Sequence, residues 1–526
     1  MSASSAPARM HATPSALGGG GARGGTGRDD SGRGAAAPGA GAGFGLRPLR
    51  DGGLRRMLVG ACAAGVAVGL VVGALHLPVA PRAGEVAGAV ATARPGPDGA
   101  PAAPAASQPP PGRPTPLAAG LGGPPASPLP PPDATTSRAL AAALANARWR
   151  YGIPGVSASI AFSDGSVWNG HAGVSDVKAK TAVKTETAFA FGSVTKTLTA
   201  ALILRLVEEG RLGLDDPVIR WLPEYADDAF LGSTPARRQL VTVRMLLAQT
   251  SGLYDYFNSL PFDARLRASK KRVWQPDEVL AYVKKPLFIA GDAWSYSNTN
   301  YLLLGLVAER AAGAPYADLL RSRVLAPAGL ASLYVQVAER TKAPIAKGYD
   351  FTSLSRTAKP IPWSDGTRVM PFTSVTSAAG SAGAVAGTAR DLARWGLALY
   401  GGSVLAPDSL ARMLAFDGTA ASGGASDYGL GVGRRLVGDR MTVGHSGRLA
   451  GFRSSLRYVP ELGVSVAVVT NQDRWDPDRV VEALLDVIDP PAPEPSPTPS
   501  GSPGATTAPT PLPADSYPPA ATPPAP

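Results

Sequence analysis

The distribution of glycine and proline along the 526-residue chain separates parts that can fold from parts that cannot. Residues 1–53 are rich in Gly, Ala, Ser and Arg, so they bury too little apolar surface to offset the entropy lost on ordering. Residues 81–133 are rich in Pro and Ala, and residues 490–526 contain 15 prolines in 37 positions. Such compositions are typical of extended linkers and tails. We therefore expect a disordered N-terminal tail, a linker and a disordered C-terminal tail around one folded domain at 134–489.

An uncharged apolar segment lies between the N-terminal tail and the linker. It runs from Met57 to Leu75 and continues to Leu77, which is long enough to span a bilayer as a helix. Four arginines precede it at positions 47, 50, 55 and 56, whereas the next arginine after it is Arg82. The positive-inside rule then predicts a cytoplasmic N-terminus and an extracellular domain. We predict a single-pass, uncleaved signal anchor at 54–80 that contacts the cell membrane through residues 57–77.

Two other fates of this segment stay open. It resembles a cleaved signal peptide with a small-residue site at 89–91, although its charged leader would then exceed 50 residues. Cys62 could be a lipid-modified cysteine, although it opens the apolar segment rather than closing it. Cys62 is the only cysteine, so we expect no disulfide, no thiol nucleophile and no cysteine metal site in the folded domain.

The net charge of +11 does not by itself indicate a nucleic-acid partner. The first 56 residues contain eight arginines and three aspartates, which accounts for almost half of that charge. A basic flank of this kind sets membrane topology and attracts anionic lipid. The rest of the charge is spread thinly, so we expect no nucleic-acid partner.

Alternating apolar residues predict β-hairpins at both ends of the domain. The first hairpin comprises 156–161 and 167–174 around an Asp-Gly turn, and the last comprises 453–459 and 464–470. Helical patterns lie between and after them, at 193–209, 243–248, 276–284, 298–312, 316–324, 388–399 and 478–487. We predict an α/β domain of the α+β type, with an antiparallel sheet built from both ends, flanking helices and a mostly helical insertion.

Ser193 and Lys196 lie three residues apart at the start of the first long helix, in the sequence FGSVTK. Residues three apart are neighbours on a helix surface, so the lysine amine can reach the serine hydroxyl. A serine needs an adjacent base to act as a nucleophile, and a lysine can serve if its surroundings lower its pKa. The same spacing also fits a helix with a serine near its cap and a lysine extending to water, so the motif alone does not decide between them.

Two further short motifs contain chemically useful side chains. Tyr296 and Asn298 lie in WSYSNTNY just before a helix, where they could equally be a packed aromatic ring and a helix cap. His445 and Gly447 lie in VGHSG at the end of a predicted strand, where a lone histidine is often structural.

With these three motifs in this order, the chain resembles the serine β-lactamase and penicillin-binding family. The resemblance covers most of 146–470 and is strongest to the branch of class C β-lactamases, D-alanyl-D-alanine carboxypeptidases and related esterases. It rests on S-x-x-K at 193–196, Y-x-N at 296–298 and H-x-G at 445–447. Supporting stretches are VEEGRL at 207–212, LLAQTSGL at 246–253 and YGLGV at 428–432.

The resemblance implies an acyl-enzyme mechanism. Ser193 would attack a carbonyl carbon, and Lys196 and the Tyr296 phenol would pass its proton to the leaving group. Because a phenol is a poor base at neutral pH, we expect Lys196 and His445 to act as cations that lower the pKa of Tyr296. The backbone N–H groups of Ser193 and Arg448 would form the oxyanion hole.

The remaining motif residues would bind substrate. The resemblance implies that Asn298 holds the substrate amide, that His445 orients substrate or steers protons, and that Gly447 lets the strand approach the ligand. Many β-lactamases of this type have lysine where this chain has His445, which favours a peptidase or esterase. The family often has histidine where this chain has Gln249, at a position that we expect to be structural.

Other candidate sites are less convincing. The stretch AGSAG at 379–383 resembles a nucleophile elbow, but we predict a Gly-rich loop near the site because no strand leads into it. We expect His171 to lie on a hairpin strand as a packing or surface residue. There is no zinc-protease, P-loop or dinucleotide motif, so we expect no cofactor and no metal.

Together these features predict an exported, membrane-anchored, monomeric serine hydrolase of D-alanyl-D-alanine cell-wall peptides. β-Lactamase and carboxylesterase activities are alternatives within the same fold. A penicillin-binding sensor that is acylated without turnover is an alternative from another functional class.

Overall fold

The computed structural model describes residues 128–225, 240–416 and 427–491. The predicted tail at 1–53 and the predicted anchor at 54–80 lie outside these residues. The same holds for the linker at 81–133 and the tail at 490–526, except for a few residues next to the domain. Among the described helices, none combines the length and the apolar character that a membrane span requires.

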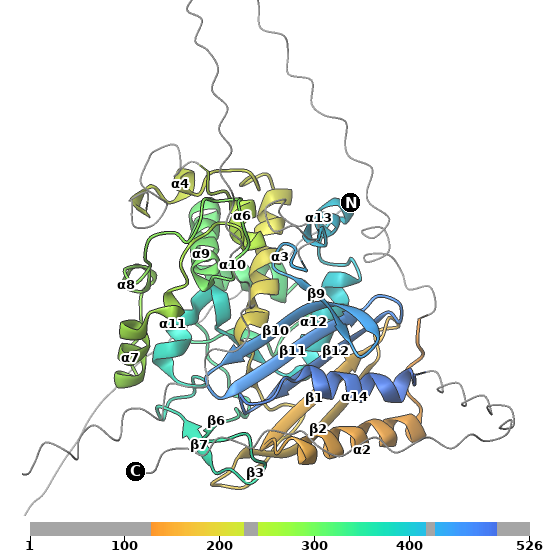
Figure 1. Ribbon diagram of the computed structural model, residues 1–526. Helices are drawn as coiled ribbons and strands as arrows, with labels where there is room; N and C mark the ends of the chain where they lie inside the picture. Colours follow the sequence, from red (N-terminus) through yellow and green to blue (C-terminus); the bar gives the residue numbers. More distant parts are fainter. Residues whose placement is uncertain (1–127, 226–239, 417–426, 492–526) are drawn as a thin grey trace, which may run out of the picture. The chain divides into compact units, whose positions relative to one another are not determined.

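A seven-stranded antiparallel sheet forms the centre of the domain, in the order β3-β2-β1-β12-β11-β10-β9 (Figure 1). β1 and β12 come from opposite ends of the domain and lie side by side, with Val156 paired to Thr470. This confirms the predicted sheet built from both ends. The strands are β1 (Gly155–Ala161), β2 (Val167–Asp176), β3 (Thr181–Ala182), β9 (Gly433–Val437), β10 (Arg440–Leu449), β11 (Phe452–Val459) and β12 (Val464–Thr470).

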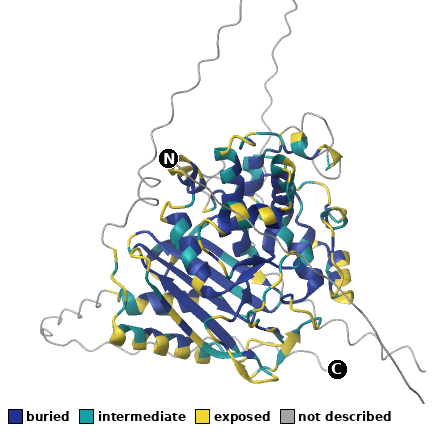
Figure 2. Cartoon of the chain, turned by 180° about the vertical axis from the view of Figure 1, so that it is seen from behind, coloured by how far each residue is buried: buried dark blue, intermediate teal, exposed yellow. Residues whose placement is uncertain are grey.

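The central strands are buried on both faces, as Figure 2 shows. Alternate residues of a strand point to opposite faces, so one strand supplies two cores. In β12, Val466 and Val468 pack into the smaller apolar cluster, whereas Ala467 and Val469 pack into the larger one. The sheet therefore separates two layers of helices.

Two terminal helices cover one face of the sheet, α2 (Ala134–Arg150) and α14 (Asp478–Ile488) (Figure 1). α14 turns Val480, Val481, Leu484 and Leu485 inward, the spacing of one helical face. Burying each of these side chains contributes roughly 1.5–3 kcal/mol. α2 follows the Asp133 N-cap and was not anticipated, because its short Ala, Thr and Ser side chains give a weak apolar pattern.

The helical insertion lies on the other face. α12 (Ala389–Tyr400) packs on β1, β11 and β12, and α3 (Thr195–Glu208) is enclosed by α9 (Asn298–Ala312), α11 (Thr373–Gly383) and β10. The other helices are α4 (Val218–Trp221), α6 (Val243–Ala248), α7 (Leu260–Ala268), α8 (Pro276–Leu280), α10 (Tyr316–Leu320) and α13 (Pro407–Met413). Short helical turns are η1 (Gly192–Val194), η2 (Pro223–Tyr225), η3 (Tyr256–Asn258) and η4 (Arg321–Leu325).

Small sheets connect the remaining segments. β4 (Phe189–Ala190), β8 (Val385–Gly387) and β5 (Tyr334–Val335) form a three-stranded sheet, and β6 (Gly348–Phe351) pairs with β7 (Pro360–Trp363). β4 leads directly into the turn that contains Ser193, so this sheet helps to place that turn.

A predicted helix and a predicted loop differ from the structure. The helix predicted at 276–284 ends at Leu280. Pro286 lies six residues beyond and disfavours helical backbone at Lys285. The loop predicted at 379–383 is instead the end of α11, interrupted at Gly380 (φ 44°, ψ −132°). Small residues let α11 pack closely on α9, because a Cβ at Gly305 would lie 2.2 Å from Ser381 Oγ.

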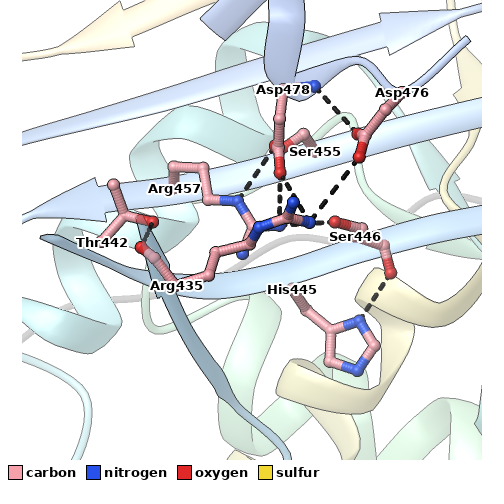
Figure 3. A network of polar contacts seen from close by, with 8 residues as sticks. All are labelled: Arg435, Thr442, His445, Ser446, Ser455, Arg457, Asp476 and Asp478. Atoms are coloured by element: carbon pink, nitrogen blue, oxygen red, sulfur yellow. Dashed lines mark hydrogen bonds and ion pairs between the residues drawn. The ribbon is translucent and has the colours of Figure 1, made fainter. Parts of the chain in front are cut away.

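A buried ion pair joins the sheet to α14 (Figure 3). Arg457 of β11 donates from Nε to Asp478 Oδ1 at 3.0 Å and from Nη2 to Asp478 Oδ2 at 2.9 Å. Both side chains are less than 10% exposed, and Arg457 also donates to the Ser446 hydroxyl of β10. Burial raises the pKa of Asp478. The charge of Arg457 and the hydrogen bonds from Arg457 and Ser455 have the larger, opposite effect, so this pKa lies below its usual value.

Removing either partner should destabilise the domain strongly, because the other charge would lose its buried, two-point partner, and only the half-exposed Arg435 would remain beside Asp478. We expect Arg457→Met or Asp478→Asn to lower the free energy of unfolding by about 3 kcal/mol or more, and the double variant to lose less than the sum. Chemical denaturation measures all three. Arg211→Met, which breaks an exposed pair with Glu209, is the matched control and should cost less than about 1 kcal/mol. Strictly additive losses would contradict this assignment.

Candidate active site

Ser193 lies in a tight turn between the small sheet and α3. It occupies η1, and α3 begins two residues later at Thr195. Gly192 precedes it with φ +55°, a conformation that favours glycine. Its neighbours Gly192 and Val194 are buried, whereas Ser193 is partly exposed. The turn therefore presents one hydroxyl from an otherwise buried segment.

Lys196 is fully buried beside this hydroxyl, as the three-residue spacing predicts. Its Nζ lies 3.3 Å from Ser193 Oγ, 2.7 Å from Asn298 Oδ1 and 2.9 Å from the Ala382 carbonyl oxygen. Burial lowers the pKa of Lys196 to about 7, against the opposing effect of Asp255. When neutral, the amine can keep N–H bonds to Asn298 and Ala382 and offer its lone pair to the Ser193 hydroxyl proton.

Tyr296 also lies beside the lysine amine. Its ring centre is 4.9 Å from Lys196 Nζ, and its buried hydroxyl has no hydrogen-bond partner among the residues that the structure describes. Burial, with a contribution from Tyr428, raises the pKa of Tyr296 well above its usual value, and Ser193 offsets this only in part. The expected lowering of this pKa is therefore wrong, and Tyr296 is a neutral phenol.

Asn298 is the first residue of α9, and its side chain does not cap the helix. Ser297 occupies the N-cap position. The Asn298 amide instead accepts a bond from Lys196 at Oδ1 and donates one from Nδ2 to Asp255 Oδ2 at 2.8 Å. Both ends of the Asn298 amide are thus hydrogen-bonded inside the site.

His445 is neutral and bonded on both sides. Its Nδ1 lies 2.6 Å from the Ser446 carbonyl oxygen, so this nitrogen carries the proton, and Nε2 then accepts from the Tyr428 hydroxyl at 3.0 Å. Burial, followed by the nearby Lys196 charge, lowers the pKa of His445 to about 3. The expectation that His445 acts as a cation beside Tyr296 is wrong, because the ring is desolvated and lies near another cation.

Gly447 allows β10 to lie against the turn that contains Ser193. A Cβ on Gly447 would be 1.9 Å from the Phe191 carbonyl oxygen, so no larger residue fits. A Cβ on Gly192 would be 2.9 Å from the backbone nitrogen of Arg448. Arg448 therefore has its backbone beside the turn, where the expected oxyanion hole needs it, while its side chain is 57% exposed and lies 3.4 Å from Asp473.

The two faces of β10 make different contacts. Figure 3 shows His445 on one side of the strand and the Ser446 hydroxyl directed to Arg457 on the other. The buried ion pair thus holds the strand from behind, and His445 faces the site.

The structure also brings three further groups into the site, of which Asp255 and Tyr428 were not predicted for it. Asp255, Tyr428 and the Ala382 carbonyl contact Asn298, His445 and Lys196 respectively. Ala382 belongs to 379–383, so the expectation that this stretch lies near the site is confirmed. Asp255 lies two residues after the motif stretch at 246–253, and Tyr428 is the first residue of the stretch at 428–432, but a contact across the fold leaves no local signal in the sequence.

The other candidates behave as structural residues. Gln249 Oε1 accepts from the Ser297 N–H at 3.0 Å and from Asn300 Nδ2 at 2.6 Å, which confirms a structural position. Ser381 of the rival motif is buried and donates to the Tyr301 carbonyl oxygen at 2.8 Å. His171 is exposed on β2. No cluster of His, Cys, Asp or Glu suited to a metal ion occurs in the part of the chain that the structure describes.

Comparisons with known proteins identify similar chains. The family model described as Beta-lactamase matches residues 138–488. The chain is 32% identical to Esterase EstB of Burkholderia gladioli, over 57% of this chain and 81% of that protein. It is 36% identical to Penicillin-binding protein 4* of Bacillus subtilis over 30% of this chain, and this match spans only 33% of that relative's length. A D-stereospecific amidohydrolase from Streptomyces sp. has 30% identity and a TM-score of 0.55, covering 69% of this chain and 100% of that one.

The pKa of Lys196 predicts the pH dependence of Ser193 acylation. Because only the neutral amine accepts the serine proton, the rate should rise with pH through an apparent pKa of about 7. Stopped-flow measurement with a nitrophenyl ester between pH 5 and 9 gives this profile. Lys196→Arg keeps a permanent charge and should lose about a thousandfold in rate across the range. Lys271→Arg on the exposed surface is the control, and a wild-type profile without this limb would exclude Lys196 as the base.

Proposed function

The chain belongs to the beta-lactamase family of serine hydrolases, and from this premise we propose that it cleaves D-alanyl-D-alanine cell-wall peptides through an acyl-enzyme on Ser193. The observation that carries the proposal is the fully buried Lys196 amine, 3.3 Å from Ser193 Oγ and with a pKa of about 7. This amine supplies the base that an isolated serine lacks.

Acylation follows from the positions of these groups. The Ser193 hydroxyl proton passes to the Lys196 amine while Oγ bonds to the substrate carbonyl carbon. The negative charge on the carbonyl oxygen is stabilised by the backbone N–H groups of Ser193 and Arg448. When the carbon–nitrogen bond breaks, the Tyr296 phenol gives its proton to the leaving amine and takes one from the Lys196 ammonium. Water then attacks the ester carbon, and the same groups transfer protons in reverse.

The neutral imidazole favours a peptide substrate over a β-lactam. Many β-lactamases of this type have a lysine ammonium at the position of His445, and this site has no such charge there. The similarity to a D-stereospecific amidohydrolase supports an amide bond next to a D-configured residue. Both observations agree with D-alanine as the leaving group.

Ester hydrolysis is the second candidate. It is favoured by the similarity to Esterase EstB, which extends over 81% of that protein. An alkoxide leaves more readily than an amine and depends less on proton donation by Tyr296. Tyr296→Phe should therefore slow amide cleavage more than ester cleavage.

Labelling with a fluorescent penicillin tests the proposal. The wild-type protein should take up one equivalent, lose it slowly and release D-alanine from a D-alanyl-D-alanine peptide. Ser193→Ala should abolish labelling and release, whereas Ser381→Ala, which removes the rival nucleophile, should retain both. The measurements are gel fluorescence over time and an enzymatic assay for D-alanine.

Each alternative gives a different result in the same assays. Fast loss of the label without D-alanine release indicates a β-lactamase, and turnover of nitrophenyl esters alone indicates an esterase. One equivalent bound without turnover of any substrate indicates a sensor. Full activity of Ser193→Ala would exclude the whole mechanism.

We also propose that the domain is exported and held at the outer side of the cell membrane by residues 57–77. The support is the uncharged apolar segment and the arginines that precede it. An external cell-wall substrate would require this location.

Fractionation and protease accessibility test the anchor. The full-length protein should remain in the membrane after carbonate extraction, and protease added to protoplasts should remove the domain. A variant lacking residues 1–80, directed outward by a cleavable signal peptide, should be released into the medium. A mature N-terminus near residue 92 would show instead that the segment is a cleaved signal peptide.

A further inference from the structure

Asp255 is a buried acid beside the site, in the loop that leads into η3. It is 7% exposed, and its Oδ2 accepts from Asn298 Nδ2 at 2.8 Å. Its Oδ1 accepts from the Phe257 N–H at 3.0 Å. Within the described ranges, no arginine or lysine forms an ion pair with it at contact distance. A buried carboxylate without a contacting cation is costly, so its position needs an explanation beyond capping a three-residue turn.

The contact with Asp255 determines which way the Asn298 amide faces. A side-chain amide has an accepting end and a donating end, and turning it over exchanges them. A carboxylate oxygen accepts, so Asp255 binds the donating end of Asn298. The accepting end then faces Lys196 Nζ at 2.7 Å. With the amide turned over, two donating groups would face each other whenever Lys196 is protonated.

We propose that Asp255 is a positioning residue for acyl transfer: it holds the Asn298 carbonyl oxygen towards Lys196 and so keeps the lysine amine beside Ser193. This inference rests on the proposed function, because it assigns a role within the same acylation step. Asp255 acts through Asn298. Its carboxylate binds the Asn298 amide, the amide binds the Lys196 amine, and the amine contacts the Ser193 hydroxyl.

Asp255 is also the acid that faces the lysine amine. The other titratable groups around Lys196 are Tyr296 and Tyr301, with ring centres 4.9 and 5.3 Å from Nζ, and His445 on β10. Burial raises the pKa of both tyrosines and lowers that of His445, so all three are neutral near pH 7. Tyr256 and Tyr428 lie next to these groups and also have raised pKa values because they are buried. Asp255 raises the pKa of Lys196, while burial raises the pKa of Asp255 itself.

The test exchanges the acid and the amide. Asp255→Asn keeps the shape of the side chain but removes its charge and lets the Asn298 amide turn over. The double variant Asp255→Asn, Asn298→Asp restores one donor and one acceptor between the two side chains and places the carboxylate against Lys196. The readout is the rate at which a fluorophosphonate labels Ser193 between pH 5 and 9. In that reaction the Ser193 Oγ–phosphorus bond forms, fluoride leaves, and the serine proton passes to Lys196.

The two variants should move the pH profile in opposite directions. The acid limb is the part of the pH–rate profile in which the labelling rate rises through the pKa of Lys196. In Asp255→Asn it should move to lower pH by about one unit or more, because the charge that raises the lysine pKa is gone. The rate above the limb should also fall about tenfold or more, because the amine is held less well. In the double variant the carboxylate is closer to the amine, so the acid limb should lie at or above the wild-type position.

Ser251→Ala is the matched control. Ser251 is buried in the same loop, 2% exposed, and donates to Asn300 Oδ1 of the same helix at 2.6 Å, without contacting Lys196. It should lower the melting temperature and leave the acid limb in place. If Asp255 only supports the loop, Asp255→Asn will behave in the same way.

The outcomes separate this inference from the proposed function. An acid limb that does not move in Asp255→Asn, or that moves equally in the single and double variants, would overturn the inference while Ser193 remains a labelled nucleophile. Absence of labelling in the wild-type protein would overturn the proposed function, and the inference with it. Opposite shifts in the two variants, with no shift in Ser251→Ala, would support the role of Asp255.

Discussion

The buried amine of Lys196 links the fold of this domain to its chemistry. Removing an ammonium group from water costs several kcal/mol, so the interior must either solvate it or favour its neutral form. Here three oxygen atoms surround the amine, from η1, α9 and α11, and none of these segments is close to another in the sequence. The helices must therefore be assembled before the lysine can serve as a base. The same desolvation that lowers its pKa to about 7 also makes it able to accept the serine proton.

The sheet contributes by bringing β10 against the turn that contains Ser193. This approach depends on missing side chains, since a Cβ at Gly447 would overlap the Phe191 carbonyl oxygen. Ser454 of β11 donates to the same carbonyl oxygen at 2.6 Å, which fixes the turn on the strand pair. Behind β10, Arg457 and Asp478 hold the strand to the outer helix layer. Because strand residues alternate between faces, β10 can be anchored on one face and line the site with the other.

The sequence was informative where the signal is local. Alternation in 156–161 and 464–470 predicted strands, and the spacing of Ser193 and Lys196 predicted their contact. It was misleading where the outcome depends on burial. Whether His445 is charged depends on desolvation by segments far away in the chain, and α11 looks like a loop because its small residues serve close packing with α9. Asp255 was missed for the same reason, as its partner Asn298 is 43 residues away.

Gln249 illustrates how one departure from the family pattern fits the site. Its carbonyl oxygen has two lone pairs, and it accepts from the backbone of Ser297 and from the Asn300 side chain at once. A histidine ring nitrogen has one lone pair and could accept only one of these bonds. Ser297 and Asn300 flank Asn298 at the start of α9, so the glutamine holds the residues that place Tyr296 and Asn298. Its backbone adopts φ +65°, an uncommon conformation for a residue other than glycine, which costs of order 1 kcal/mol or more. α6 ends at Ala248, and Gln249 leaves the helix in this conformation as its C-cap residue, with its side chain bonded to the first turn of α9.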